Sequence, residues 1–339
     1  MKIYFRSFLL LTGLFFLISC DPNADRNQFF IKGKVSLNEK NYGDAIRYFS
    51  EAIKLDSAFY EALNNRGVAL FGQRKYDLAI ADYSRAIQVN DTLADAYYNR
   101  SNAYYELEDF EQALSDLNIV TGIYPDSAYV FLNRGMVYQQ LGKTDSALVD
   151  FNSAIRLNPK NEAAYVNKGY ILYTRQLYDE AESAFKSALE VNPKQHQACN
   201  NLGLIESEKG NFDEALKYYD RAIELKPSHP FYRNNRGYAR MNQNDLDGAE
   251  QDFKLSVFYD EKNPLAQRNM GICLVKKGDE KALEFLTTAK QLNADTPQLY
   301  FWLGKALLLK GNQNEACKAF VESKSRNEGL VSEKEMKGC

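Results

Sequence analysis

Histidine and cysteine are the side chains of this 339-residue chain best suited to bind a metal ion or act as a nucleophile, and both are scarce. The two histidines, His196 and His229, lie 33 residues apart, and their imidazoles could share a metal ion if they sat on adjacent turns. Metal and catalytic sites need more groups at fixed spacing, and the sequence has no paired CxxC, HExxH, P-loop or glycine-rich nucleotide motif. We therefore expect no metal, no cofactor and no enzymatic activity.

Cys20 is a candidate for covalent lipid attachment because of the segment that precedes it. Lys2 and Arg6 are followed by an apolar run over residues 8–18, which is too short to span a bilayer and suits the apolar region of a secretory signal. The run ends in the sequence LISC, which resembles the lipobox of bacterial lipoproteins. A plain signal peptide followed by an unrelated cysteine is the alternative.

The lipoprotein resemblance implies that residues 1–19 are cleaved off as a signal peptide and that Cys20 becomes an acylated N-terminus. Residues 20–26 would then form the lipidated cysteine and a short linker. More than one acyl chain of the palmitate kind anchors a protein stably. We therefore expect a lipid-anchored protein of the bacterial cell envelope, with the choice between inner and outer membrane left open.

The charge of the chain argues against nucleic-acid binding. It has 42 Lys and Arg against 45 Asp and Glu, a net charge of −3, and no block of basic residues. A nucleic-acid surface requires clustered positive charge. We therefore expect no nucleic-acid partner.

Small residues recur along the chain with a period of 34 residues, which is typical of a repeated helical hairpin. Each repeat has a glycine, an alanine twelve residues later and a large apolar residue four residues after that, as in Gly135, Ala147 and Phe151. Glycine inside a helix costs about 0.5–1 kcal/mol relative to alanine, and it is tolerated where another helix must come close. The repeated positions are Gly33, Gly67, Gly135, Gly169, Gly203, Gly237, Gly271 and Gly304, with Ser101 in the one gap.

The pattern resembles the tetratricopeptide repeat (TPR) over roughly residues 26–330. The resemblance implies an all-α fold, a right-handed α-solenoid of about nine helix-turn-helix hairpins whose first helices line the inner surface. We assign residues 27–330 to the nine hairpins and residues 331–339 to a short C-terminal cap. One residue is missing between Gly271 and Ala282, which predicts a tightened turn in the eighth hairpin.

An asparagine precedes the glycine position by two residues in seven consecutive hairpins. The TPR geometry implies that this position faces the inner surface, where regularly spaced carboxamides could donate to and accept from an extended peptide backbone. We predict that this Asn ladder binds a partner, and the alternative is a purely structural role. The Asn ladder consists of Asn65, Asn99, Asn133, Asn167, Asn201, Asn235 and Asn269.

Aromatic residues at positions that the family turns inward or to its edge are further candidates for partner binding, because tyrosines are frequent anchors at interfaces. Packing against the next hairpin is the alternative for each of them. The candidates are Tyr98, Tyr105, Tyr129, Tyr170, Tyr173, Phe231 and Tyr238.

The residue just before the glycine position is arginine in the second, third, fourth and seventh hairpins. The same four hairpins have an aspartate sixteen residues later, as in Arg100 and Asp116. Where Leu202 replaces the arginine, Tyr218 replaces the aspartate. This covariation predicts an Arg–Asp ion pair between the two helices of a hairpin, exchanged elsewhere for apolar packing, and it assigns the arginines a structural role.

The remaining cysteines divide into two pairs. Cys199 and Cys273 are expected on first helices two hairpins apart, too distant for a disulfide, and are predicted to pack as small apolar groups. Cys317 and the terminal Cys339 could meet if the C-terminal segment folds back, and an exported compartment is oxidising. We predict a Cys317–Cys339 disulfide, so neither thiol should react with an alkylating agent in the non-reduced protein.

These observations predict a non-catalytic scaffold for protein–protein interaction. It would be a membrane-anchored TPR lipoprotein that holds an extended segment of a protein or peptide partner on its concave face. The alternative is a carrier that binds a cell-wall glycan or peptide on the same face.

Overall fold

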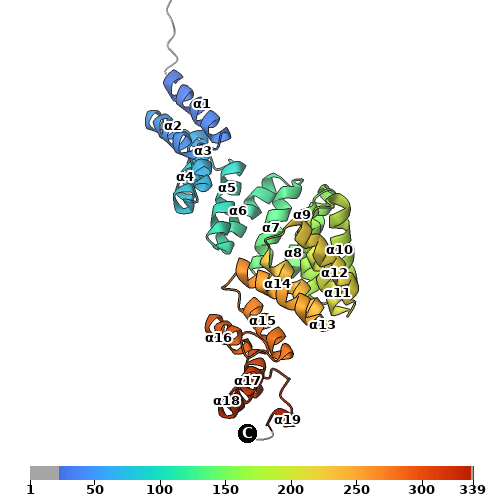
Figure 1. Ribbon diagram of the computed structural model, residues 1–339. Coiled ribbons are helices and arrows are strands. Elements are labelled where there is room, and N and C mark those ends of the chain that lie inside the picture. Colours follow the sequence, from blue (N-terminus) through green and yellow to red (C-terminus); the bar gives the residue numbers. More distant parts are fainter. Residues whose placement is uncertain (1–22, 337–338) are drawn as a thin grey trace, which may run out of the picture. The chain divides into compact units, whose positions relative to one another are not determined.

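The structure, a computed structural model, describes residues 23–336 and residue 339. The predicted signal peptide, the lipobox and Cys20 lie outside the described residues. Within the described residues the chain forms nineteen α-helices and no β-strand (Figure 1). The first eighteen form nine hairpins, and we call the odd-numbered helix of each hairpin its A helix and the even-numbered one its B helix. The predicted all-α solenoid of helical hairpins is confirmed.

One compact module extends to Pro125 and includes residues 140–142, and its helices form hairpins 1–3. Within this module each helix contacts the next one along the chain, and its A helices also contact one another in order, the first with the second and the second with the third. The helices of this module are α1 (Ala24–Asn38), α2 (Tyr42–Leu55), α3 (Tyr60–Gly72), α4 (Tyr76–Val89), α5 (Ala94–Glu106) and α6 (Phe110–Ile123).

The second module comprises residues 126–139 and 143–339 and holds hairpins 4–9. From α8 onward each helix contacts its successor, and the A helices from α9 to α17 contact one another in order. The helices are α7 (Ala128–Gln140), α8 (Thr144–Leu157), α9 (Glu162–Thr174), α10 (Tyr178–Val191), α11 (His196–Glu208), α12 (Phe212–Leu225), α13 (Pro230–Asn242), α14 (Leu246–Tyr259), α15 (Pro264–Lys277), α16 (Ala282–Leu292), α17 (Leu299–Leu309), α18 (Gln313–Ser325) and α19 (Glu333–Met336).

The two helices of a hairpin meet where the glycine of the A helix faces a large side chain of the B helix. In hairpin 5, a Cβ atom added to Gly169 would lie 2.7 Å from a ring carbon of Phe185, and that ring is fully buried. In hairpin 3 the buried Ser101 takes the glycine position, and the aromatic ring gives way to the smaller Leu117. In hairpin 8 a leucine, Leu286, faces Gly271, so the large B-helix side chain is aromatic in seven of the nine hairpins.

Hairpin 8 has one residue fewer between Gly271 and Ala282 than the other hairpins have between the equivalent positions. Gly278, with a φ of 76°, ends α15 in the left-handed conformation that glycine adopts without strain. The B helix α16 then begins at Ala282, whereas B helices such as α10 begin three residues before the equivalent alanine, Ala181. The predicted tightening of the turn is wrong. Residues 278–281 connect α15 to α16, whereas only residues 175–177 connect α9 to α10, so the missing residue instead shortens the B helix, which has 11 residues in α16 and 14 in α10.

The predicted Arg–Asp ion pairs are confirmed in all four hairpins. In each, Nε and Nη2 of the guanidinium donate one hydrogen bond each to the two carboxylate oxygens, over 2.6–2.9 Å. The four aspartates are only 1–4% exposed, so the bidentate geometry compensates a charge that is buried. The pairs are Arg66–Asp82, Arg100–Asp116, Arg134–Asp150 and Arg236–Asp252.

Arg66 and Arg100 also bind the B helix of the preceding hairpin. Nη1 of Arg66 donates to the hydroxyl of Ser50 over 3.0 Å, and Nη1 of Arg100 donates to Ser84 over 2.9 Å. The hydrogen bonds to Asp116 raise the pKa of Arg100 above its ordinary value. Each of these arginines therefore joins three helices, which supports the structural role predicted for them.

The segment after α18 folds back along hairpin 9. Cys317 and Cys339 form a disulfide, with their Cα atoms 5.4 Å apart, the pairing predicted from the sequence. Lys305 of α17 pairs with Glu335 of α19 over 2.8 Å, and apolar side chains of the segment pack on the cluster around Phe301. The C-terminal segment thus covers part of the last A helix.

We predict that the Arg–Asp pair of hairpin 3 can be exchanged for the apolar pair of hairpin 6. Arg100→Leu alone leaves Asp116 buried without its partner, which costs about 3–5 kcal/mol. The double variant Arg100→Leu, Asp116→Tyr copies Leu202 and Tyr218, which pack in one cluster, and should regain more than half of that loss. Thermal and urea unfolding of the purified protein measure both effects. A double variant as unstable as Arg100→Leu would contradict the exchange.

Candidate binding groove on the A helices

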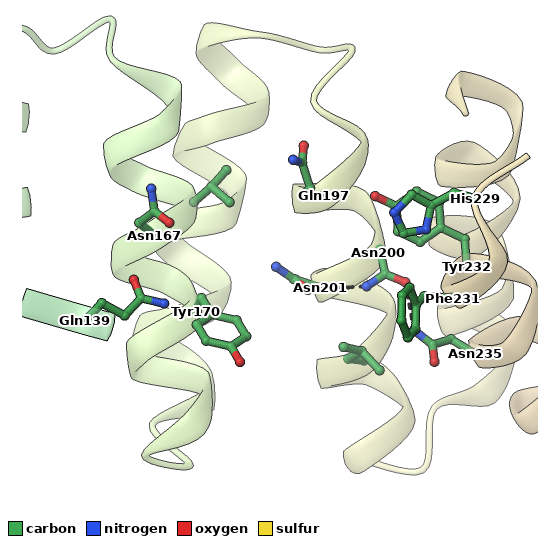
Figure 2. A pocket seen from close by; sticks show the side chains of 12 residues that line it. Gln139, Asn167, Tyr170, Gln197, Asn200, Asn201, His229, Phe231, Tyr232 and Asn235 are labelled. Atoms are coloured by element: carbon green, nitrogen blue, oxygen red, sulfur yellow. Dashed lines mark hydrogen bonds between the residues drawn. The ribbon is translucent and has the colours of Figure 1, made fainter. Parts of the chain in front are cut away.

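A groove of about 540 Å³ lies in the second module, and side chains of four consecutive A helices, α7, α9, α11 and α13, line it (Figure 2). No B helix contributes to its lining. The predicted inner-surface role of the A helices is thus seen in this module. The lining residues are Gln139, Val166, Asn167, Tyr170, Gln197, Asn200, Asn201, Leu204, His229, Phe231, Tyr232 and Asn235.

Half of the groove's lining side chains are carboxamides, and none is an aspartate, glutamate, lysine or arginine. This composition is unusual for a chain in which 26% of the residues are charged. His229 is the lining side chain that could become charged near neutral pH, and burial lowers its pKa, with smaller contributions from Lys226 and His196. At neutral pH the groove therefore presents hydrogen-bonding and apolar groups without formal charge.

Three members of the Asn ladder hold neighbouring hairpins together. Each donates a hydrogen bond from Nδ2 to Oδ1 of an asparagine 35 residues earlier, on the preceding A helix. The bonds are Asn99 to Asn64 (3.1 Å), Asn235 to Asn200 (2.9 Å) and Asn269 to Asn234 (2.9 Å). The ladder is thus in part a set of ties between hairpins, which is the structural alternative weighed for it.

Other members of the ladder are placed differently. Asn65 and Asn167 donate to carbonyl oxygens of their own helices, at Glu61 and Ala163. Asn133 lies half-buried on α7. The side chains of Asn167, Asn201 and Asn235 line the groove, and for these three the binding role stays a prediction.

Asn269 requires a correction. It is only 3% exposed, and its amide donates to Asn234, so it cannot contact a partner directly. Its burial among the A helices of hairpins 7 and 8 removes the surface that the ladder offers elsewhere. The prediction of a binding role is wrong at this position.

The groove contains a short chain of hydrogen-bonded carboxamides that crosses from α13 to α11. Asn235 donates to Oδ1 of Asn200, and Asn200 in turn donates from Nδ2 to Oδ1 of Asn201 over 3.3 Å (Figure 2). Asn200 is 8% exposed, while the two outer members are less buried. The buried middle residue therefore fixes the orientation of the two that face the groove.

The predicted tyrosines separate into groove and packing residues. Tyr170 lines the groove and is 47% exposed. Tyr105 and Tyr173 instead pack against aromatic residues at the start of their own B helices, with ring centroids 5.4 and 5.8 Å apart, and burial raises the pKa of Tyr173 to about 12. The other three lie outside the groove lining: Tyr98 is half-buried, and Tyr129 and Tyr238 are exposed.

The two histidines lie at the N-terminal ends of α11 and α13, where they contact the same tyrosine. Nδ1 of His196 lies 2.5 Å from the hydroxyl of Tyr232, and the His229 ring stacks on the Tyr232 ring with centroids 3.9 Å apart. Burial lowers the pKa of both imidazoles, and Lys226 lowers both further. In the part of the chain that the structure describes, no group of three or more His, Cys, Asp or Glu side chains is arranged to hold a metal ion.

Several residues of the groove were not predicted from the sequence. Gln139, Gln197 and Asn200 stand at different positions of the repeat, so no single column of the 34-residue pattern contains them. The doubled asparagines, as in Asn200-Asn201, were a usable signal, because the first asparagine of each pair accepts the bond from the next hairpin. Recognising it requires the register between hairpins, which the repeat alone does not reveal.

Lowering the pH from 7.5 to 5.5 should lower the thermal unfolding midpoint. Both histidines have folded-state pKa values below the unfolded value of about 6.5, so the unfolded chain binds more protons in this window and the folded state loses stability as pH falls. The chain contains two histidines, and carboxylates titrate at lower pH. The double variant His196→Gln, His229→Phe should show a flatter profile, and an equally steep profile would contradict this assignment.

Among the described residues, no helix combines the length and the apolar character needed to cross a membrane. No curated protein matches the chain in sequence. Four family models, each described as a tetratricopeptide repeat, match residues 29–59, 60–93, 101–168, and 168–230 with 200–265. Together these matches span well over half of the chain.

Solved structures share the fold. A tetratricopeptide repeat protein from Parabacteroides merdae ATCC 43184 is 20% identical, with a TM-score of 0.61 over 74% of this chain and 99% of that one. The Cut9–Hcn1 hetero-tetramer of APC/C gives 16% identity and a TM-score of 0.61 over 90% and 74% of the two chains. The pilF protein of Pseudomonas aeruginosa gives 20% identity and a TM-score of 0.55 over 62% and 96%. The family models and the hairpin geometry agree, and the chain belongs to the tetratricopeptide-repeat family.

Proposed function

We propose that the protein is a non-catalytic scaffold that holds an extended segment of a partner protein in the groove of hairpins 4–7. TPR proteins generally act as scaffolds for protein interaction. The observation that carries the proposal is the groove itself, in which four consecutive A helices present carboxamides between exposed aromatic rings. A ligand that contacts all four helices must be elongated, and an extended polypeptide meets this requirement.

We further propose that acyl chains on Cys20 tether the scaffold to a membrane of the bacterial cell envelope. The support is the sequence of residues 1–20, with its basic start, apolar run and lipobox-like end. Because α1 begins at Ala24, the linker would reach at most about 15 Å and would hold hairpin 1 close to the bilayer.

A Cys20→Ser variant tests the tether. It should fail to incorporate a fatty-acid analogue in growing cells and should move from the membrane fraction to the soluble fraction, because the acyl acceptor is lost. Continued membrane association of the variant, with labelling unchanged, would rule the lipid anchor out.

A neutral glycan is the second candidate ligand. Tyr170 and Phe231 are each 47% exposed in or beside the groove, and flat aromatic faces with neighbouring carboxamides also suit sugar rings. Binding to purified cell wall that is lost on Phe231→Ala would favour this candidate over a protein partner.

Photo-crosslinking in intact cells tests the partner-holding groove. p-Benzoylphenylalanine at Phe231, in the groove, should capture a discrete polypeptide that mass spectrometry can identify. The matched control is Phe258 on the B helix α14, which is 73% exposed and outside the groove lining. The same crosslinker at Tyr170 should capture the polypeptide found from Phe231.

Two results would count against the groove. One is an identical background at Phe231 and Phe258, and the other is capture of different polypeptides from Phe231 and Tyr170. In either case the working surface would have to lie on the B helices or at the ends of the hairpin array.

A further inference from the structure

The lining of the groove carries no formal charge, and two arginines of α13 beside it are paired with aspartates of the B helices. On α13, Arg233 and Arg236 both approach Asp252 of α14, over 3.9 and 2.6 Å. Arg236 also pairs with Asp220 of α12 over 2.6 Å. The two guanidinium groups closest in sequence to Asn235 therefore form ion pairs with aspartates that do not line the groove. The residues that line the groove include no counter-ion for a charged ligand.

The chain of hydrogen-bonded carboxamides fixes which amide atoms are left to bind a ligand. Asn235 uses its Nδ2 and Asn201 uses its Oδ1 within the chain. The Nδ2 donor of Asn201 and the Oδ1 acceptor of Asn235 make no hydrogen bond with the described residues. Figure 2 shows the Asn201 amide nitrogen directed toward α9 and the Asn235 oxygen at the opposite end of the chain. The carboxamide chain thus leaves one donor, on Asn201, and one acceptor, on Asn235, to a ligand, on adjacent A helices.

Two exposed rings flank these amides. Tyr170 extends from α9 and Phe231 from α13, on either side of α11 (Figure 2), and Leu204 of α11 also lines the groove. Each ring is 47% exposed, an extent that leaves apolar surface for a ligand to cover. At about 25 cal/mol per Å² of apolar surface, covering two half-exposed rings contributes more than the amide bonds do.

We propose that the groove selects an uncharged, extended polypeptide segment, which places one apolar side chain against Tyr170 and another against Phe231 and aligns its backbone with Asn201 and Asn235. The inference rests on the proposed scaffold function and specifies the partner's chemistry. A carbonyl of the segment accepts from Asn201, and an N–H donates to Asn235. Asp, Glu, Lys and Arg are excluded at the covered positions, because burying them without a partner is costly.

The spacing of the helices fits such a segment. Packed helices lie 8–10 Å apart and an extended chain rises about 3.3 Å per residue, so roughly three residues span one helix-to-helix step. Side chains then alternate between the groove and solvent. A sugar hydroxyl can also accept from Asn201 or donate to Asn235, and competition with cell-wall fragments distinguishes that ligand from a polypeptide.

Selection from a random twelve-residue peptide library displayed on phage tests the proposal on the whole mature chain. The informative variant is Asn201→Asp, which keeps the acceptor for Asn200 but replaces the free donor with a negative charge. The matched control is Asn152→Asp on the exposed face of the B helix α8. Peptides selected by the wild type and by Asn152→Asp should be uncharged, with two apolar residues about six positions apart. The synthesised peptides should bind Asn201→Asp about tenfold or more weakly, as expected for losing one hydrogen bond to a desolvated group.

The possible outcomes distinguish a failure of the selection for uncharged segments from a failure of the scaffold function. Selected peptides that share a charged motif, and lose binding on Phe231→Ala, would overturn the selection for uncharged segments while leaving the scaffold function in place. If the selected peptides bind all variants equally, or if no peptide is enriched, the groove is not a protein-binding site. Competition between cell-wall fragments and the selected peptides for the wild-type protein would indicate that the groove binds a glycan instead.

Discussion

The packing of an A-helix glycine against a buried B-helix ring sets the distance between the helices of a hairpin, and the rest of the structure depends on it. In hairpin 2 a Cβ atom on Gly67 would come within 2.5 Å of the Tyr83 ring, so no larger residue fits without moving the helices apart. Because this contact recurs, the A helices follow one another at regular intervals within each module. A surface that needs side chains from several A helices, such as the groove, exists only on that condition.

The Arg–Asp pairs add specificity to this packing. An ion pair that is almost completely buried is weak evidence for stability, because the attraction must first offset the desolvation of both charges. Its bidentate geometry does, however, fix the register of one helix against another. Through their bonds to Ser50 and Ser84, Arg66 and Arg100 extend that register to the preceding hairpin. Leu202 and Tyr218 show that one hairpin can do without it.

Features contained within one repeat could be predicted from the sequence. The glycine, the alanine, the ring and the Arg–Asp pair lie within 34 residues of one another, and nine copies let their covariation be observed within a single chain. The deletion in hairpin 8 was visible for the same reason, since a deletion displaces every later position, but the sequence placed it in the turn, whereas it shortens α16. Cys317 and Cys339 were paired by elimination and by the expectation of a folded-back terminus.

Features that arise between repeats could not be predicted in the same way. The bond from Asn99 to Asn64 joins residues at different positions of the repeat, and its existence depends on the offset between hairpins. The burial of Asn269 depends on its neighbours in hairpins 7 and 8, which the pattern treats as equivalent to the others. The groove lining likewise combines positions from the beginning, middle and end of different A helices, so a search along one repeat position recovers only part of it.

The hydrogen bonds between asparagines of neighbouring A helices are unevenly distributed along the chain. In the second module, Asn200 ties α11 to α13, and Asn234 ties α13 to α15. The equivalent residue on α9 is Val166, which has no polar atom in its side chain and cannot accept the amide of Asn201. The step from α9 to α11 therefore relies on apolar packing at this position, whereas the steps from α11 to α13 and from α13 to α15 each add a hydrogen bond between side-chain amides.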